Sequence, residues 1–530
     1  MHITKVVVKN YRCLRDSTTV LNDTLSVIVG NNECGKTTLL EAIHLALSGQ
    51  LNGRPLIVEL HPYLFNQEVV LQYISALRAG KKPPLPDILI ELYFADVPEL
   101  AKFKGINNSL REDVPGVKLS IEFDEANKDS YASYIADPSL VRTIPVEFYS
   151  YKLRAFTDND TTPRAIPIKS SLIDASTIRN GVAANRYVVD IVKSSLSNKD
   201  QVDLALSYRL MRDRFLDEKK VAAINAELAK KRGSVSNKSL TISLDTSSRT
   251  SWETGVMPQL DDIPITLVGK GEQSSVKVKL SLETSADSHL VMVEEAENHL
   301  SHSNLNALIE HISKNRGNRQ LLITTHSSYV LNKLGIESVL LFGKAGSMTL
   351  KQLTPETKDY FLKLPGHDTL RLILAERTIL VEGPSDELIV QAAFNRRHGK
   401  MPLQAGVDVI AVRALAFKRF LEIANLLNLK TDVVTDNDGD IDALREKYKG
   451  YLEKERIKIH YDNDVGCRTL EPQLLKANGI SVINAILGTQ YQTDAELLAY
   501  MENRKTDVAL KFFKTEMPWT APAYIEEAIG

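Results

Sequence analysis

Residues 25–38, LSVIVGNNECGKTT, decide the fold of the N-terminal half. The apolar run Leu25–Val29 is typical of a buried parallel strand. It leads directly into Gly30–Thr37, a complete match to the pattern G-x-x-x-x-G-K-[ST], and an amphipathic helical pattern then runs to a stop at Gly49. A strand, a glycine loop and a helix in this order predict a phosphate-binding loop, in preference to a glycine turn with a purely structural role.

The chemistry of such a loop defines the first expected ligands, ATP and Mg²⁺. Backbone N–H groups of the loop and the N-terminus of the following helix favour an anion. We expect the Lys36 ammonium to reach the β- and γ-phosphates of ATP and the Thr37 hydroxyl to bind Mg²⁺. The loop residues expected to contact ATP are Asn31, Asn32, Gly35, Lys36, Thr37 and Thr38.

An acid pair lies far downstream of this loop. The segment His289–Val293 is mostly apolar and is followed by Glu294 and Glu295. An apolar strand that ends in two acids supplies one carboxylate for the Mg²⁺ ion and a second to orient the attacking water. We therefore expect Glu294 to be a metal ligand and Glu295 to be the catalytic base. A solvated turn is the alternative for an acid pair taken alone.

Two further segments complete the ATPase pattern. Leu267–Ser274 contains Gly269 and Gly271, and an apolar strand at Leu321–Thr325 is followed by His326. In this order along the chain, the motifs resemble those of ABC-type ATPases of the SMC and DNA-repair kind. The resemblance implies that Gly269 and Gly271 contact the ATP of a partner subunit and that His326 is the switch histidine.

The stretch between the loop and these motifs is long. Strands are predicted over Ile88–Phe94, Lys118–Phe123 and Val146–Tyr151, and residues 181–235 predict a helical insertion because charged and apolar residues alternate at helical spacing in places. Two interpretations of the insertion stay open. It is either a set of helices packed on the ATPase core or a dimerisation module, and we favour the module.

A second α/β pattern begins after a loop-like stretch at Pro355–Asp368. Strands are predicted over Thr378–Val381 and Asp432–Thr435, and acids follow each of them. Carboxylates at the carboxyl ends of neighbouring parallel strands converge on one crevice, and their hard oxygens suit Mg²⁺ or Mn²⁺. The expected metal ligands are Glu382, Asp386, Asp436 and Asp438, with Glu471 as a further candidate. An acidic turn is the alternative for residues 436–440.

The segment Val381–Glu387, VEGPSDE, together with the later D-x-D motif, resembles the Toprim domain of nucleases of the OLD (overcoming lysogenisation defect) family. The resemblance implies catalytic roles for Glu382, Asp436 and Asp438 in two-metal hydrolysis of phosphodiester bonds. Lys505 matches the position of a lysine that stabilises charge on the reacting phosphate in that family. A lysine on a helix surface is the alternative.

The OLD resemblance also implies a function for the whole chain. It implies an ATP-dependent or ATP-regulated DNA endonuclease, working as a homodimer or higher homo-oligomer in antiphage defence, with a second defence protein or a nucleic acid as a further expected partner. The alternative is a DNA-binding ATPase of the SMC or repair kind whose Toprim half binds DNA without cutting it. That alternative would hydrolyse ATP and leave DNA intact even with Mn²⁺.

Composition limits the class of protein. The 530 residues carry a formal net charge of −2, so DNA binding needs local basic patches or metal-screened carboxylates. No apolar run reaches the ~20 residues that cross a bilayer. Three scattered cysteines fit a reducing compartment. We therefore expect a cytoplasmic protein that makes no membrane contact.

These patterns predict an α/β protein with two halves. The first is an ABC/SMC-like P-loop ATPase formed by residues 1–180 and 236–355, interrupted by the insertion at 181–235. The second is a Toprim domain with a parallel sheet over residues 370–530.

Overall fold

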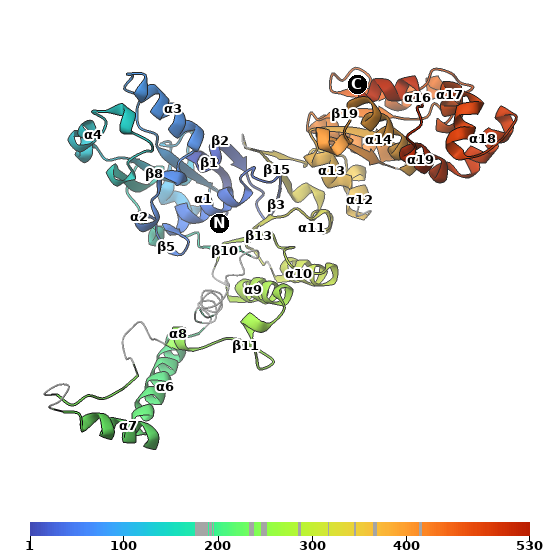
Figure 1. The fold of residues 1–530 in the computed structure, drawn as a ribbon. Helices are drawn as coiled ribbons and strands as arrows, with labels where there is room; N and C mark the ends of the chain where they lie inside the picture. The colour runs from blue at the N-terminus through green and yellow to red at the C-terminus, as the bar shows by residue number, and fades with distance from the viewer. Residues whose placement is uncertain are drawn as a thin grey trace. The chain divides into compact units, whose positions relative to one another are not determined.

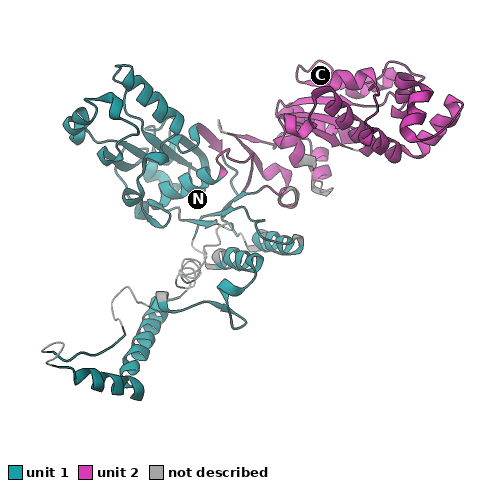
Figure 2. Ribbon diagram, viewed as in Figure 1, with its two compact units in different colours: residues 1–15, 21–25, 37–325 teal, residues 16–20, 26–36, 326–530 magenta. Residues whose placement is uncertain are grey.

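The computed structural model describes residues 1–174, 189, 193, 196–232, 238–244, 252–284, 288–315, 317–343, 346–363, 368–412 and 416–530 (Figure 1). The chain divides into two compact units, which are coloured separately in Figure 2. Unit 1 comprises residues 1–15, 21–25 and 37–325, and unit 2 comprises residues 16–20, 26–36 and 326–530.

Unit 1 contains an antiparallel arrangement of four strands, paired in the order β1–β6–β8–β9. Their bounds are Ile3–Tyr11 for β1, Ile88–Phe94 for β6, Val114–Phe123 for β8 and Tyr149–Ala155 for β9. The predicted strand at Ile88–Phe94 is confirmed, and β8 begins at Val114 instead of Lys118. The third predicted strand was placed too early. Its first residues, Val146–Phe148, form a 3-10 turn in which the Phe148 N–H donates to the Pro145 carbonyl.

Unit 1 also contains three parallel strands in the order β10–β13–β14. They span Ser170–Asp174, Leu290–Glu294 and Gln320–Thr324. All five residues of β14 and the first four of β13 are buried, as expected for a strand covered on both faces. Glu294 is the last residue of β13, so the acid pair begins inside the strand.

The helices of unit 1 include α1, which directly follows the glycine loop and ends at Ser48, before Gly49 with φ +68°. The predicted stop at Gly49 is therefore confirmed. The other long helices of unit 1 are α3 (Gln67–Arg78), α6 (Asn198–Asp217), α7 (Lys219–Ala229), α9 (Lys270–Thr284) and α10 (His302–Asn315).

The predicted insertion is helical in its described part. Helix α6 begins at a capping box formed by Ser197 and Asp200, and α7 follows it at once. No side chain of α6 is buried, so this helix does not pack on a core within the described residues. Most of residues 181–195 lie outside the described part of the chain.

Unit 2 includes most of strand β3 (Leu25–Val29), whose five residues are all buried. Val27–Val29 pair in parallel with β15 (Val339–Gly343), which forms an antiparallel pair with β16 (Gly346–Thr349). This arrangement confirms the buried strand expected before the glycine loop.

The segment after β16 corrects one prediction. Residues 355–363 form helix α12 (Pro355–Lys363), where the sequence had indicated a loop. Proline is compatible with the first turn of a helix, because its missing N–H has no partner there. Glu422 accepts hydrogen bonds from the backbone and the hydroxyl of Thr354, which stabilises the start of α12.

The C-terminal part of unit 2 is built on a four-stranded sheet in the order β18–β17–β19–β20, in which every pair is parallel. The strands span Val407–Ala411, Arg377–Val381, Lys430–Val434 and Ile457–His460. Its helices are α13 (Asp368–Leu374), α14 (Pro384–His398), α15 (Phe417–Leu426), α16 (Ile441–Tyr448), α17 (Leu470–Leu487), α18 (Asp494–Asn503), α19 (Lys505–Lys514) and α20 (Ala523–Ile529). The expected α/β class with a parallel C-terminal sheet is therefore confirmed.

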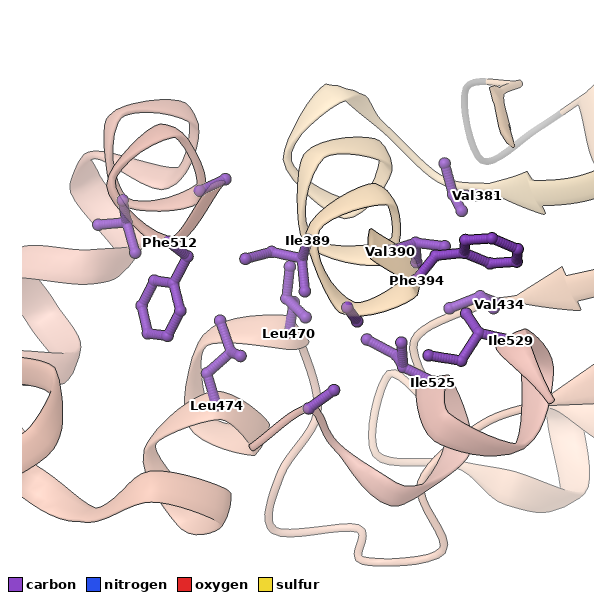
Figure 3. Packing of buried hydrophobic residues seen from close by; sticks show 14 of the residues in the cluster. Val381, Ile389, Val390, Phe394, Val434, Leu470, Leu474, Phe512, Ile525 and Ile529 are labelled. Atoms are coloured by element: carbon purple, nitrogen blue, oxygen red, sulfur yellow. The ribbon is translucent and has the colours of Figure 1, made fainter. Parts of the chain in front are cut away.

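One apolar core joins α14, α17, α18, α19 and α20 to the sheet (Figure 3). The core includes Ile389 and Phe394 of α14 and Val434 of β19, together with Leu470 of α17, Phe512 of α19 and Ile525 of α20. Elements far apart in sequence thus share one core, and this packing fixes where α17 and α19 begin relative to the sheet.

The strand order creates a crevice at a defined place. The chain runs from β17 to β18 on one side and then returns to β19 on the other side. In an open parallel sheet, a ligand site forms outside the carboxyl ends of the strands at such a reversal. Because Val381 is paired with Val434, the residues that follow β17 and β19 leave the sheet side by side.

Two observations concern the cysteines and the apolar helices. Cys13, Cys34 and Cys467 are all free thiols. Among the described helices, none combines the length and apolarity needed to cross a membrane.

Candidate functional site

The glycine loop is held tightly against the sheet. A Cβ atom on Gly30 would lie 2.4 Å from the carbonyl oxygen of Phe342 in β15, so only glycine fits at this position. Gly35 has φ +104°, a conformation that also favours glycine. The Lys36 ammonium donates to the carbonyls of Gly30 (2.9 Å) and Asn31 (3.0 Å). A buried ammonium held by the loop in this way is placed to meet a phosphate.

The residues expected to bind Mg²⁺ beside ATP are in direct contact. The Thr37 hydroxyl donates a hydrogen bond to the carboxylate of Glu294 at the end of β13. Thr38 is buried beside Cys13, whereas Asn31 and Asn32 are exposed. The structure thus brings Thr37 and Glu294 together across most of unit 1, although the sequence separates them widely.

Glu295, the expected catalytic base, has an unusual backbone. Its φ is 45°, in the left-handed region that non-glycine residues rarely adopt. The Glu295 N–H donates to the Thr324 hydroxyl at the end of β14 (3.0 Å), and its carboxylate accepts from the Asn298 amide. A strained backbone fixed by neighbouring strands is common at functional positions.

The expected signature segment is the start of a helix. The Gly269 carbonyl accepts from the N–H groups of Glu272 (3.0 Å) and Gln273 (3.1 Å), so α9 begins where a glycine loop was expected. A Cβ atom on Gly271 would lie 2.4 Å from the His299 carbonyl, so a contact within the chain requires this glycine. A contact of Gly269 and Gly271 with a partner's ATP stays a prediction.

His326 is the expected switch histidine. His326 lies two residues after the end of β14 and is exposed. Its role stays a prediction.

The second site lies at the crevice of the C-terminal sheet. Glu382 directly follows β17, and its Oε1 accepts from the Thr435 hydroxyl (2.6 Å) and from the Asp436 N–H (3.0 Å). Asp386, in the first turn of α14, accepts from the Gly383 N–H (3.1 Å). The acids that follow β17 and β19 thus lie side by side, as the strand pairing requires.

Four carboxylates form what we call the acidic cluster: Glu382, Asp386, Asp436 and Glu471. Burial, reinforced by the Glu382 and Glu471 carboxylates, raises the pKa of Asp386 to about 7. Burial and the other three carboxylates raise the pKa of Asp436 to about 8, against the opposing effect of Lys505. The four groups therefore repel one another, and a bound cation would relieve that repulsion.

Glu471 and Lys505 reach the cluster from different helices. Glu471, in the first turn of α17, is 2% exposed and accepts from the Thr469 hydroxyl (3.1 Å). The Lys505 ammonium, at the start of α19, lies 3.2 Å from the Glu471 carboxylate. Burial alone would lower the pKa of Lys505, but Glu471, Asp436 and Asp386 together outweigh burial and raise it. The Lys505 ammonium therefore places a positive charge next to the acidic cluster.

Asp438 stands apart from the acidic cluster. Its side chain is exposed, its φ is 51°, and its N–H donates to the Arg468 carbonyl (3.3 Å). The second acid of the D-x-D motif thus lies at the rim of the crevice.

The acidic cluster suits a hard divalent cation by its donor chemistry, because all its ligand atoms are carboxylate oxygens. Within the described ranges, no three His, Cys, Asp or Glu side chains converge closely enough to form a ready-made metal site. Backbone, hydroxyl and ammonium groups contact oxygens of Glu382, Asp386 and Glu471.

Sequence reasoning missed three residues of this site. Thr435 and Asn437 flank Asp436 and are buried, and a hydroxyl or amide residue between acids at a strand end was the available signal. Tyr524 of α20 is also buried, and burial together with Asp436 and Asp386 raises its pKa well above the ordinary value. Tyr524 carried no signal, because only the packing of α20 brings it near the crevice.

Three solved structures have a limited likeness to the chain. An SMC head bound to the C-winged helix domain of ScpA is 13% identical, with 66% of this chain and 99% of that chain covered and a TM-score of 0.33. The SMC head domain of Thermotoga maritima is 13% identical, with 66% and 99% covered and a TM-score of 0.30. The recombination mediator RecF of the RecFOR pathway is 12% identical, with 66% and 98% covered and a TM-score of 0.34. No curated protein matches the chain significantly.

Two family models match the chain. Residues 1–113, which include the glycine loop, match the AAA ATPase domain. Residues 373–438, which include Glu382, Asp386, Asp436 and Asp438, match the TOPRIM domain of overcoming lysogenization defect protein-like proteins. The chain thus carries an AAA-type ATPase domain at its N-terminus and an OLD-like Toprim domain towards its C-terminus, and this order matches an OLD-family ATPase–Toprim fusion.

Proposed function

We propose that this protein is an ATP-dependent or ATP-regulated DNA endonuclease that hydrolyses phosphodiester bonds at the acidic cluster with divalent metal ions. The observation that supports this most directly is that Glu382, Asp386, Asp436 and Glu471 lie near enough at one edge of a parallel sheet to repel one another, with Lys505 beside Glu471. Burial and the neighbouring carboxylates raise the pKa of two of these acids, so four negative charges here are unfavourable without a cation. Such an arrangement is typical of a functional site.

The proposed roles follow from chemistry. The four carboxylates would hold Mg²⁺ or Mn²⁺, which supplies an activated water and stabilises the leaving oxygen when bound. Lys505 would stabilise negative charge on the reacting phosphate. Asp438, at the rim of the crevice, is proposed as a ligand of a second ion.

In the ATPase half, Lys36 would bind the phosphates, and Thr37 with Glu294 would hold Mg²⁺ beside them. The contact between the Thr37 hydroxyl and the Glu294 carboxylate supports this pair. Glu295 is proposed as the base that orients the attacking water. His326, Gly269 and Gly271 are proposed to complete the site, the two glycines from a partner subunit.

A homodimer is part of this proposal, with the helical insertion as its dimerisation module. Helix α6 has no buried side chain and carries a row of apolar residues at helical spacing. The exposed fractions of this row are 65% for Val202, 54% for Leu206 and 51% for Leu210. An apolar row of this kind favours contact with another protein surface over exposure to water.

The biological role is proposed from the OLD-like domain pairing. We propose that the protein acts in the cytoplasm on foreign DNA in antiphage defence, and that a second defence protein or a nucleic acid takes part. Neighbouring genes would indicate that partner.

The test is conversion of supercoiled plasmid to nicked and linear forms, with Mg²⁺ or Mn²⁺ and with or without ATP. Wild type is compared with Asp436→Ala, which removes one acid of the cluster, and with Lys36→Ala, which removes the phosphate-binding ammonium. We expect cleavage to disappear with Asp436→Ala and to lose its ATP response with Lys36→Ala. ATP hydrolysis without cleavage under every condition would overturn the proposal and favour a DNA-binding ATPase that does not cut.

A further inference from the structure

Thr435 lies between strand β19 and Asp436 and is 3% exposed. Its hydroxyl donates to Oε1 of Glu382 (2.6 Å), and the Asp436 N–H donates to the same oxygen (3.0 Å). Within the described part of the chain, both hydrogen bonds to the Glu382 carboxylate thus fall on one of its two oxygens. The carboxylate is held in a fixed orientation in which Oε2 is left for another ligand.

Asn437, on the other side of Asp436, holds the loop itself. It is 1% exposed, and its amide nitrogen donates to the carbonyls of Asp462 (2.8 Å), Asp464 (2.9 Å) and Cys467 (3.3 Å). Its amide oxygen accepts from the Gly439 N–H (2.8 Å). A neutral amide makes these bonds without adding another charge beside the acids.

We infer that Thr435 is a positioning residue for the metal-binding carboxylates. Its hydroxyl fixes Glu382 so that one oxygen is satisfied by the protein and the other is available to a divalent ion, while Asn437 fixes the loop that carries Thr435 and Asp436. This inference rests on the proposed metal-dependent function of the acidic cluster. The inference concerns how the ligands are oriented before metal binds. The identity of the ligand residues does not by itself determine that orientation.

The physical reason is the cost of ordering a long acidic side chain among like charges. A free glutamate would rotate away from Asp386 and Asp436, and binding a metal would then have to restore its orientation. Hydrogen bonds that already orient the Glu382 carboxylate remove this ordering cost from the free energy of metal binding. Loss of such a bond typically weakens metal affinity 10–100-fold.

The experiment compares three variants of the full-length protein. Thr435→Val keeps the shape of the side chain but removes the hydroxyl, and Thr435→Ser restores the hydroxyl. Thr431→Val is the matched control, because Thr431 is also buried on β19 and its hydroxyl lies 3.1 Å from that of Thr378, a threonine outside the acidic cluster. Thermal melts without metal establish that each variant is folded.

The readout is Mn²⁺ affinity, measured by titration calorimetry without DNA or nucleotide. We expect Thr435→Val to weaken Mn²⁺ binding about 10–100-fold. Thr435→Ser should restore most of the affinity, and Thr431→Val should leave it unchanged. Plasmid cleavage by Thr435→Val should recover towards the wild-type rate as Mn²⁺ is raised to saturation, since the metal ligands themselves are intact.

The outcomes separate this inference from the proposed function. Wild-type Mn²⁺ affinity in Thr435→Val, or an equal loss in Thr431→Val, would overturn the positioning role while the metal site stands. Absence of Mn²⁺ binding to the wild type would overturn both. A wild type that binds Mn²⁺ but cleaves no DNA, with affinity lost in Thr435→Val, would support the positioning role and overturn the nuclease.

Discussion

Replacement of Asp436 by asparagine should stabilise the metal-free protein while removing its response to metal. The Asp436 carboxylate is half-buried beside Glu382, Asp386 and Glu471, and its pKa is raised from 3.8 to about 8. Asparagine has nearly the same shape but carries no charge. The substitution therefore removes repulsion from the acidic cluster without leaving a cavity.

The magnitude follows from the pKa. One pKa unit corresponds to about 1.4 kcal/mol, so the cost of ionising Asp436 in the folded protein at pH 8 is at most about 5 kcal/mol. The carboxylates titrate together and share this cost, so we expect Asp436→Asn to raise the free energy of unfolding by about 2 kcal/mol. For a domain of this size, such a change raises Tm by roughly 4–8 °C.

The pH dependence has a definite sign. Because the folded-state pKa of Asp436 lies above the unfolded value, the folded wild type binds more protons, and its stability falls as the pH rises from about 4 to about 8. The advantage of Asp436→Asn should therefore shrink about threefold between pH 8 and pH 5. At pH 8, Mg²⁺ or Mn²⁺ should raise the Tm of the wild type and not that of the variant.

The assay is thermal unfolding in EDTA and in metal at both pH values. Asp438→Asn is the matched control, because Asp438 is exposed in the same loop and its left-handed backbone also suits asparagine. We expect that control to change Tm little in EDTA. An Asp436→Asn variant no more stable than wild type at pH 8, or equally stabilised at both pH values, would refute the electrostatic account of the cluster.

Four further predictions concern other parts of the protein. Lys36→Ala should abolish ATP binding, and an unchanged ATP affinity in a filter-binding or calorimetric assay would remove the phosphate-binding assignment. Gly30→Ala places a Cβ atom 2.4 Å from a backbone carbonyl, and should cost about 1–3 kcal/mol in a thermal melt together with ATP affinity. Lys505→Ala should slow plasmid cleavage about 100-fold with Mn²⁺ affinity retained, whereas cleavage at the wild-type rate would make it a surface lysine. Asp432→Ala should destabilise the protein by about 3–5 kcal/mol, because it leaves the buried Arg377 guanidinium unpaired. Burial would raise the pKa of Asp432, but His460 and Arg377 lower it, so its stabilising effect should be lost as the pH falls below about 4 in acid unfolding of the wild type.

The glycine loop and its surroundings could be read from the sequence because their information is local. The apolar strand, the two glycines, Lys36 and the helix stop at Gly49 lie within a few turns of chain, and each residue type suits its own backbone conformation. The same holds for Glu382 and Asp436, since each follows a short apolar strand.

What the sequence did not reveal has equally physical reasons. A proline at residue 355 indicated a loop, yet proline also suits the first turn of a helix, and Glu422 from a distant helix stabilises that turn. Asp438 was grouped with Asp436 because both are acids of one motif. The Asp438 side chain is exposed whereas that of Asp436 is half-buried. Spacing alone does not reveal this difference, and the role of Asp438 as a metal ligand stays a prediction.

The sequence by itself determined the two α/β halves, the phosphate-binding loop and the acids that end two strands of the second half. Only the tertiary structure decided which of those acids lie close together. The order β18–β17–β19–β20 places Glu382 beside Asp436, and the shared core of α14, α17, α19 and α20 brings Glu471 and Lys505 to the same crevice. The physical reason is that residue periodicity reports local burial. The choice of neighbouring strands and helices depends instead on packing energy spread over the whole core.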